Sequence, residues 1–192
     1  RSEAQTIWEA WIHFLEFGRF AWSFRLAKGT SLEGEIRRIW LDGKRELAAF
    51  QDKLAELRHV LNKQQARKRL VGQFSTDFLE AWLYNMDPSL CKAVNDLLGL
   101  LRKGLPNEEL AFWEGRVWEA AWSMAVHGNS RGGEDGEEGQ RDLNKLLPPE
   151  NWLTDASRQL LLEAIDEVQR ESPGRVAGLR QHLLRNGTLP EL

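Results

Sequence analysis

The sequence predicts an all-α fold: a single-domain helical bundle of about six to seven helices around a core rich in Trp and Phe. Three observations support this prediction. Apolar residues recur every three or four positions along most of the chain, which is the period of a buried helix face. No segment alternates apolar and polar residues between turn signals, as a half-buried strand would. The 192 residues also contain nine Trp and eight Phe, large side chains that build a core from few residues.

The first expected helix runs from Ser2 to Ala27, and the rest of the chain is organised around it. It is apolar on most of its circumference, so several other helices must cover it. Its main apolar face carries Trp8, Trp11, Ile12, Leu15, Trp22 and Leu26. Gly18 lies in the middle and costs about 1 kcal/mol relative to Ala. We therefore expect a kink or a close helix crossing at this glycine.

The second expected helix begins in a capping box, with Thr30 as N-cap and Glu33 reaching back. Behind it, apolar residues follow alternating steps of four and three, which is a heptad seam. The seam consists of Ile36, Trp40, Gly43, Leu47, Phe50, Leu54, Leu57 and Leu61. We expect one helix of about thirty residues, about 45 Å long, packed against the first helix. A self-associating coiled coil is the alternative, although Trp and Phe are poor knobs for a tight dimer.

Three further helices are expected before residue 128, at about 65–85, 88–104 and 107–127. Asp87-Pro88 supplies an N-cap and a proline at the first helical position, and Gly104 ends the same helix. The pattern leaves open whether the second and third helices join or turn near residue 62. Residues 110–125 carry a second wide aromatic face, which we expect to lie against residues 7–26 of the first helix.

The C-terminal third is expected to start with a mobile loop. Residues 128–141 contain five Gly, four acidic residues and no apolar residue, so they cannot bury enough surface to become ordered. Two more helices follow, at about 154–171 and 173–185. All of these segments are assigned to one domain that covers residues 1–192.

Charge is distributed unevenly along the chain. The net charge of −3 gives no global attraction to nucleic acid or to an anionic membrane. Residues 1–104 nevertheless hold 17 Lys/Arg against 13 Asp/Glu, a net +4, and residues 105–192 hold 9 against 16, a net −7. The best binding candidate is a basic stretch that could follow a phosphate backbone. It consists of Arg58, Lys63, Arg67, Lys68 and Arg69, with His59 beside them.

Two other interpretations of the basic stretch stay open. It also fits the solvated face of an ordinary soluble helix. A basic patch in the first half and an acidic loop at residues 134–138 could instead indicate a head-to-tail contact between proteins.

Catalytic and metal-binding candidates are sparse. Glu56 and His59 have the Glu-x-x-His spacing of di-iron bundles, but the second such step is absent. Glu9, His13 and Glu16 share a side of the first helix without a partner ligand set, and a histidine there is better explained by packing. We therefore expect no metal and no cofactor.

One spacing resembles a known family of enzymes. Arg175 and His182 share a face of the last expected helix. Their separation resembles the Arg-x(4–6)-His motif of HEPN-type helical ribonucleases, in which a cation and an imidazole act on RNA. The residue after the arginine, Val176, departs from the polar residue usual in that motif. The resemblance covers two residues and implies a ribonuclease as a third hypothesis.

The location expected for the protein is the cytoplasm. A single cysteine, Cys91, excludes an intrachain disulfide and fits a reducing compartment. No apolar run reaches the length of a transmembrane helix, and no signal peptide is visible. We therefore expect no contact with a membrane.

These observations favour a non-enzymatic helical interaction or assembly module that binds a protein partner. No convergent catalytic set is present, the charge is segregated, and any exposed Trp would be a binding hot spot. The alternative is a subunit of a nucleoprotein complex that binds the RNA or DNA backbone through the basic stretch. The sequence does not determine the oligomeric state.

Overall fold

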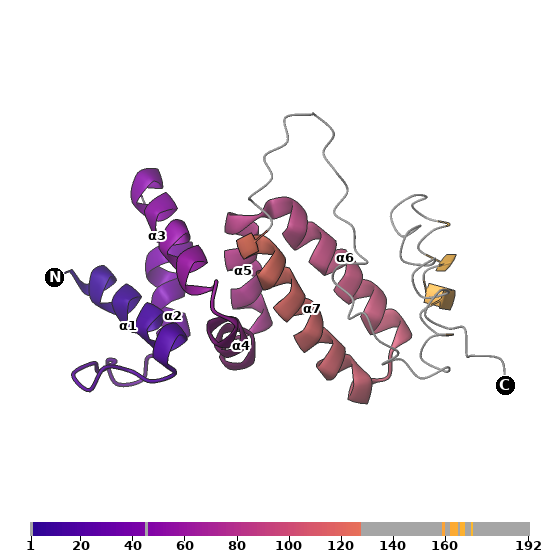
Figure 1. Ribbon diagram of the computed structural model, residues 1–192, viewed down its shortest axis with the longest axis horizontal. Helices are drawn as coiled ribbons and strands as arrows, with labels where there is room; N and C mark the ends of the chain where they lie inside the picture. The colour runs from indigo at the N-terminus through magenta and orange to yellow at the C-terminus, as the bar shows by residue number, and fades with distance from the viewer. Residues whose placement is uncertain are drawn as a thin grey trace. The chain divides into compact units, whose positions relative to one another are not determined.

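A computed structural model describes residues 2–44 and 46–127, together with 159, 162–164, 166, 167 and 170 (Figure 1). All regular structure among these residues is helical, which confirms the predicted all-α class and its aromatic core. The described chain forms two compact units. The first unit holds residues 2–88 and 122–127, and the second holds residues 89–121 with the helical residues between 159 and 170. The single domain over residues 1–192 stays a prediction.

Helix α1 (Glu3–Phe17) is ten residues shorter at its end than the predicted first helix. Ser2 caps its start, and its hydroxyl accepts a hydrogen bond from the Gln5 amide at 3.2 Å. Gly18 has φ of 73°, and its N–H donates to the Phe14 carbonyl at 2.8 Å. Glycine adopts this left-handed conformation without a Cβ penalty. Gly18 therefore ends the helix, and the prediction of a kink inside a longer helix was wrong.

The predicted long second helix is broken in two. Helix α2 (Leu32–Ile36) continues into a π-helical turn, η1 (Arg37–Leu41), and helix α3 (Leu47–Val60) begins after a break. The break depends on Gly43. A Cβ at this position would lie 2.9 Å from the Ile39 carbonyl oxygen, so only glycine allows the chain to turn so close to its own backbone.

The capping residue and the heptad seam also differ from the prediction. Ser31, and not Thr30, is the N-cap of α2, and its hydroxyl accepts from the Gly34 amide at 3.0 Å. Leu47, which the seam placed inward, is exposed. The seam therefore identifies buried apolar positions over much of its length. These positions lie on separate helices, however, and not on one continuous helix.

A second break separates helix α4 (Gln64–Gln73) from helix α5 (Thr76–Met86), where one helix was predicted. Ser75 caps α5 and accepts from the Phe78 amide at 3.3 Å. The Glu33 carboxylate accepts hydrogen bonds from both the hydroxyl and the amide of Ser75. This partner lies 42 positions away in the sequence, so no local signal could have predicted it. The open question about residue 62 is settled by the turn between α3 and α4.

Helices α6 (Pro88–Gly104) and α7 (Asn107–His127) begin and end within a residue of their predicted bounds. Helix α6 buries one apolar face, which includes Leu90, Val94, Leu97, Leu98 and Leu101. In the second unit, Arg102 of α6 forms an ion pair with Glu114 of α7, at 2.8 Å between Nε and Oε1. The predicted loop at 128–141, most of the helix at 154–171 and the helix at 173–185 lie outside the described residues.

The core of the first unit is a cluster of indole rings. Trp11 of α1 and Trp82 of α5 have ring centroids 5.0 Å apart, and Trp8 lies 5.2 Å from Trp11 and 5.7 Å from Trp82. All three are fully buried. Phe50 of α3 and Phe78 of α5 complete the cluster around Trp82. Aromatic rings at such tilted and edge-on distances gain stability beyond their buried area.

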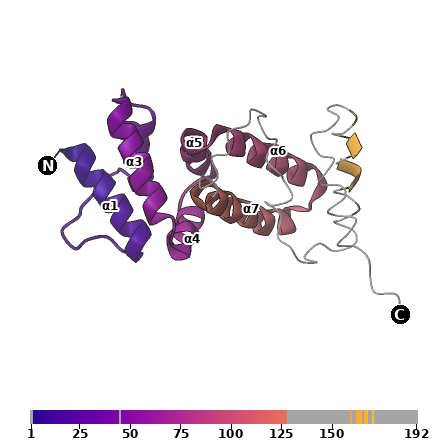
Figure 2. The same ribbon diagram turned by 45° about the horizontal axis from the view of Figure 1, so that its top comes forward.

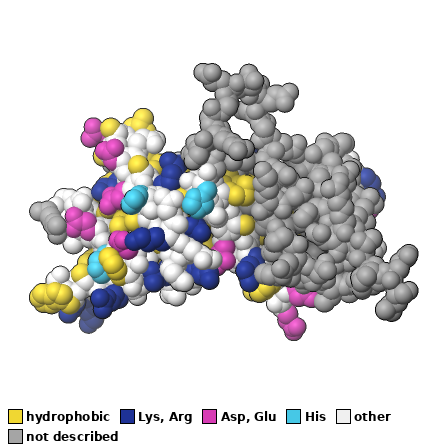
Figure 3. Space-filling model, viewed as in Figure 1, with side chains coloured by type: hydrophobic (Ala, Val, Ile, Leu, Met, Phe, Trp, Pro, Cys, Tyr) yellow, Lys and Arg dark blue, Asp and Glu magenta, His cyan; other side chains and the backbone are white. Residues whose placement is uncertain are grey.

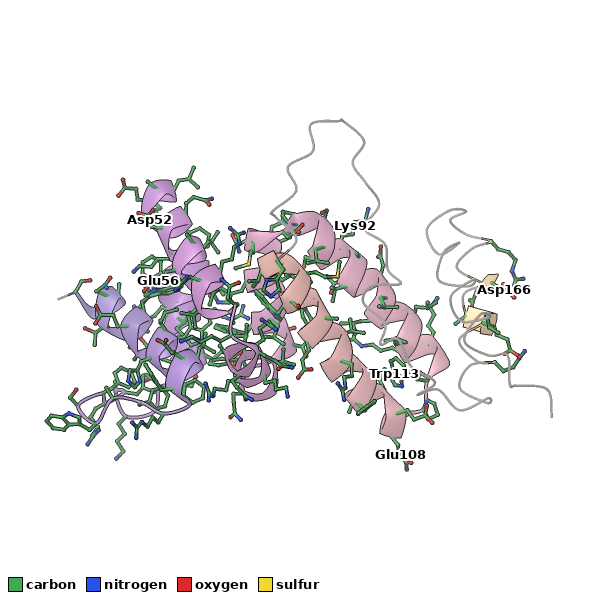
Figure 4. The ribbon with its side chains drawn as sticks, viewed as in Figure 1. Asp52, Glu56, Lys92, Glu108, Trp113 and Asp166 are labelled. Atoms are coloured by element: carbon green, nitrogen blue, oxygen red, sulfur yellow. The ribbon has the colours of Figure 1, made fainter. Side chains whose placement is uncertain are left out.

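Helix α1 was predicted to be covered on most of its circumference, but it buries only one face, with Ile7, Trp8, Ala10, Trp11 and Leu15. Helix α1 does pack against the second expected helix, as predicted. It packs against α2, α3 and α4, and Figure 2 shows α1 beside α3 and α4 from a second direction. The predicted contact of α1 with residues 110–125 stays a prediction. The indole of Trp8 also donates to Glu56 of α3 at 2.6 Å, and Lys53 Nζ lies 3.1 Å from the same carboxylate. Figure 4 labels Glu56 on α3.

We predict that Trp82→Ala destabilises the protein by about 3–5 kcal/mol, because it opens a large cavity among four aromatic rings. Urea unfolding followed by far-UV circular dichroism measures the change. Trp22→Ala is the matched control, since Trp22 is exposed, and its effect should stay within about 0.5 kcal/mol. Equal losses in the two variants would contradict the assignment of the core.

Candidate functional site

The main cluster of exposed aromatic side chains lies at the end of α1 and in the loop that follows it. Phe17 is 55% exposed, Phe20 41% and Trp22 89%. We call residues 17–28 the aromatic loop. Figure 3 shows hydrophobic and basic side chains together on the surface over this segment. Exposed apolar patches of this kind usually mark a binding surface.

Ring contacts hold the aromatic loop against α1. Phe20 stacks on Phe14 with a centroid distance of 5.1 Å, and Phe24 lies 5.4 Å from Phe20. His13 donates from Nδ1 to the Arg19 carbonyl at 2.8 Å. A carbonyl only accepts, so Nδ1 carries a proton in this contact. The loop is therefore a defined structure, tied back to the helix from which it leaves.

A turn at Ala21–Phe24 presents the tryptophan. The Phe24 amide donates to the Ala21 carbonyl at 2.9 Å. The Arg25 guanidinium donates to the carbonyls of Trp22 and Phe24, both at 2.8 Å. These hydrogen bonds fix the backbone of the turn. The turn therefore loses little conformational freedom when the exposed indole binds a partner.

The aromatic loop is basic as well as apolar. Residues 17–28 contain Arg19, Arg25 and Lys28, all exposed, and no acidic residue. The acidic side chain just before the loop, Glu16, forms an ion pair with Lys63. The surface therefore carries positive charge beside exposed rings, a combination enriched at protein–protein contacts.

Arg69, predicted as a nucleic-acid contact, binds the end of α1. Its Nη1 donates to the carbonyls of Leu15 and Glu16, both at 2.8 Å. A cation at a helix C-terminus satisfies unpaired carbonyls and complements the helix dipole. A Cβ on Gly18 would lie 2.9 Å from Arg69 Nε. The glycine and the arginine together end the helix and start the loop.

The other predicted basic residues have mixed environments. Arg67 donates to the carbonyls of Leu61 and Asn62, at 2.8 and 2.9 Å, and so holds the turn between α3 and α4. Lys63 binds Glu16, whereas Lys68 is exposed and Arg58 is half-buried. Three of the five residues thus serve contacts within the chain, and their role toward nucleic acid stays a prediction.

The candidate metal and catalytic residues that are described do not converge. Glu9 accepts from Gln5 at 2.8 Å, His13 binds a backbone carbonyl, and Glu56 accepts from Trp8 and Lys53. Across residues 2–44 and 46–127, no group of three His, Cys, Asp or Glu is placed to hold a metal. Cys91 is buried. Arg175 and His182 lie outside the described residues.

Sequence reasoning missed the aromatic loop because it assigned these residues to a helix. The apolar periodicity continues past Gly18, so Trp22 was placed on the main apolar face of the helix. The available signal was Gly18 itself, since a glycine within a helical pattern is also the commonest residue at a helix C-terminus.

None of the helices that are described is long and apolar enough to cross a bilayer.

Comparison with known proteins gives a family match. The sequence model of a family described as contractile injection system tape measure protein matches residues 1–186. No curated protein and no solved structure matches the chain.

We predict that Arg69→Ala destabilises the protein by about 1–2 kcal/mol, because two carbonyls of α1 lose a charged donor. Lys68→Ala, on the neighbouring exposed lysine, should change stability by less than about 0.5 kcal/mol. Urea unfolding of the two variants tests this. If both behave alike, Arg69 is not a helix cap.

A second prediction concerns the ion pair beside the loop. The hydrogen bond from Lys63 lowers the pKa of Glu16 below its ordinary value of 4.5. The pair therefore stabilises the fold above pH 4.5 and loses its effect as the pH falls through the lowered pKa. Lys63→Met should raise the Glu16 pKa toward 4.5, as measured by a carboxyl NMR titration. Lys68→Met should leave it unchanged, and equal shifts in both variants would refute the pairing.

Proposed function

This chain belongs to the contractile injection system tape measure protein family, and from that premise we propose that it is a non-enzymatic assembly component. In this proposal, the chain docks onto another protein of the injection system through its aromatic loop. The family match supports the assignment to an injection system. The arrangement of residues 17–28 supports the choice of docking surface.

The observation that carries the proposal is the exposed indole of Trp22. A large aromatic side chain left in water has a solvation cost, and it also invites aggregation. Trp and Arg are the residues most enriched at binding hot spots, especially where neighbouring contacts exclude water. Trp22 stands on a turn that Arg25 fastens, with Phe17 and Phe20 beside it. These features support a preformed protein-contact surface.

Two further observations support an assembly role over the alternatives. The residues that could act as acids, bases or metal ligands on α1 and α3, such as His13 and Glu56, bind partners within the chain. Arg67 and Arg69, the centre of the predicted nucleic-acid surface, use their donors on backbone carbonyls. Fewer free cations weaken the case for tracking a phosphate backbone.

The test is recovery of identified partners. The full-length protein is tagged and produced together with the other proteins of its injection system, and the co-purified components are identified by mass spectrometry. We predict that Trp22→Ala lowers recovery of the partner by about 30-fold, the effect of losing a hot-spot residue worth about 2 kcal/mol. Tyr84→Ala, on a tyrosine that is 61% exposed on α5, is the matched control.

Both variants should unfold at the same urea concentration as the unmodified protein, so that recovery reports binding alone. Unchanged recovery with Trp22→Ala would rule out the aromatic loop as the contact surface. Capture of no component of the injection system would reject the assembly role itself.

A further inference from the structure

We propose that the aromatic loop recognises an apolar pocket rimmed by carboxylates on its protein partner, and that Trp22 is the residue that enters this pocket. Arg19 and Lys28 form ion pairs with the carboxylates of the rim. This inference rests on the proposed function, because it states the chemistry of the partner surface that the loop fits. It follows from the ring faces that remain open and from the charges that no acid on this chain neutralises.

The three exposed rings of the loop are not equally available. Phe20 already stacks on Phe14, with an interplanar angle of 23°, and the Phe17 ring lies 4.7 Å from the His13 ring. Both of these rings are therefore partly covered by contacts within the chain. Trp22 is 89% exposed, and its indole has no ring contact with any residue that the structure describes. Both faces of this indole are open to a partner.

An indole with both faces open gains most from a partner that covers both of them, which a pocket does. A large aromatic side chain then buries about 150–250 Å². Binding hot spots are often aromatic residues in desolvated pockets, with contacts around them that exclude water. Phe17 and Phe20 supply such surrounding contacts beside Trp22. The hydrogen bonds from Arg25 to the carbonyls of Trp22 and Phe24 fix the backbone that presents the indole.

The cations of the loop have no acidic partner within the chain. Arg19, Arg25 and Lys28 are exposed. None of the three forms an ion pair with a residue in the described part of the chain. The carbonyls that Arg25 binds are neutral, so its positive charge is also uncompensated.

The acidic residues that flank the loop in the sequence are already occupied. Glu16, directly before the loop, pairs with Lys63, and Glu33, the first acid after it, binds the amide and hydroxyl of Ser75. Arg69 adds a further positive charge where the loop leaves α1. The loop therefore presents positive charge around its exposed rings. Carboxylates around an apolar pocket are the protein surface that complements this arrangement.

Nucleic acid and an anionic bilayer also carry negative charge, but they fit this surface less well. A single strand binds by stacking successive bases on successive open rings, whereas within the loop Trp22 alone has both faces open. Binding to an anionic bilayer usually takes a cluster of about four to eight Lys or Arg, and residues 17–28 hold three. The net charge of −3 opposes the approach of either polyanion.

The first experiment measures how recovery of the partner depends on charge. The tagged full-length protein is produced together with the other proteins of its injection system and purified at low and at high salt. At low salt, a form with Arg19→Glu and Lys28→Glu should recover about tenfold less of the component that the unmodified protein recovers, because repulsion replaces attraction at the rim. High salt should narrow this difference to about twofold, since exposed charges are screened.

The matched control carries Lys44→Glu and Lys92→Glu, on two exposed lysines outside the loop. It has the same net charge as the first reversed form and should recover the component normally. Circular dichroism verifies that each form is folded.

The second experiment locates the carboxylates of the rim. A water-soluble carbodiimide joins a lysine amine to a carboxylate that it contacts directly, and mass spectrometry identifies the joined peptides. We expect a link from Lys28 to an Asp or Glu of the recovered component, and its loss in the Trp22→Ala form. Replacing that Asp or Glu by Lys in the component should restore its recovery by the form with Arg19→Glu and Lys28→Glu.

The outcomes separate this inference from the proposed function. Trp22-dependent recovery that both reversed forms retain, or that both lose equally, overturns the carboxylate rim and leaves the proposed function standing. A recovered component to which Lys28 forms no link has the same consequence. Recovery of no component of the injection system rejects the proposed function and this inference with it.

The other ligands are tested with defined probes. Phosphatidylserine vesicles and a single-stranded oligonucleotide are titrated into the full-length protein while its tryptophan fluorescence is recorded. We expect no Trp22-dependent change with either. Saturable binding of one of them that Trp22→Ala removes would assign the loop to that ligand and overturn the inference.

Discussion

The candidate site depends on the hydrogen bonds from Arg69 to the last carbonyls of α1. Gly18 turns the chain in a conformation that glycine adopts freely, and the guanidinium satisfies carbonyls that the helix leaves unpaired. Without this ending, the apolar period would carry Phe20 and Trp22 onward as helix. The same arginine is thereby part of the fold, and its predicted contact with nucleic acid stays a prediction.

Tryptophan has two separate roles in this protein. Trp8, Trp11 and Trp82 form the core of the first unit, where each is fully buried among other rings. Trp22, in the same expected helix as Trp8, is exposed on a fastened turn. Burial of the first three stabilises the scaffold through area and ring contacts. The scaffold in turn holds the loop in one conformation, which is the condition for an exposed aromatic residue to bind well.

Membership of the contractile injection system tape measure protein family agrees with a chain that combines a buried Trp core and an exposed aromatic loop. An assembly component needs a stable helical body and a surface that recognises a neighbour, and it needs no convergent acid–base or metal set.

The sequence by itself determined the elements whose ends have local signals. Pro88 and Gly104 delimit α6, and the all-helical class follows from periodicity over the whole chain. Glycines at positions 18 and 43 mark possible ends in the sequence, but tertiary structure decided that α1 and the predicted long helix stop there and which aromatic residues face water. Those outcomes rest on partners distant in sequence, such as Arg69 for α1 and Glu33 for Ser75. A residue pattern reports apolar spacing along one segment, but it cannot show which distant side chain will reach the unpaired backbone groups at a possible break.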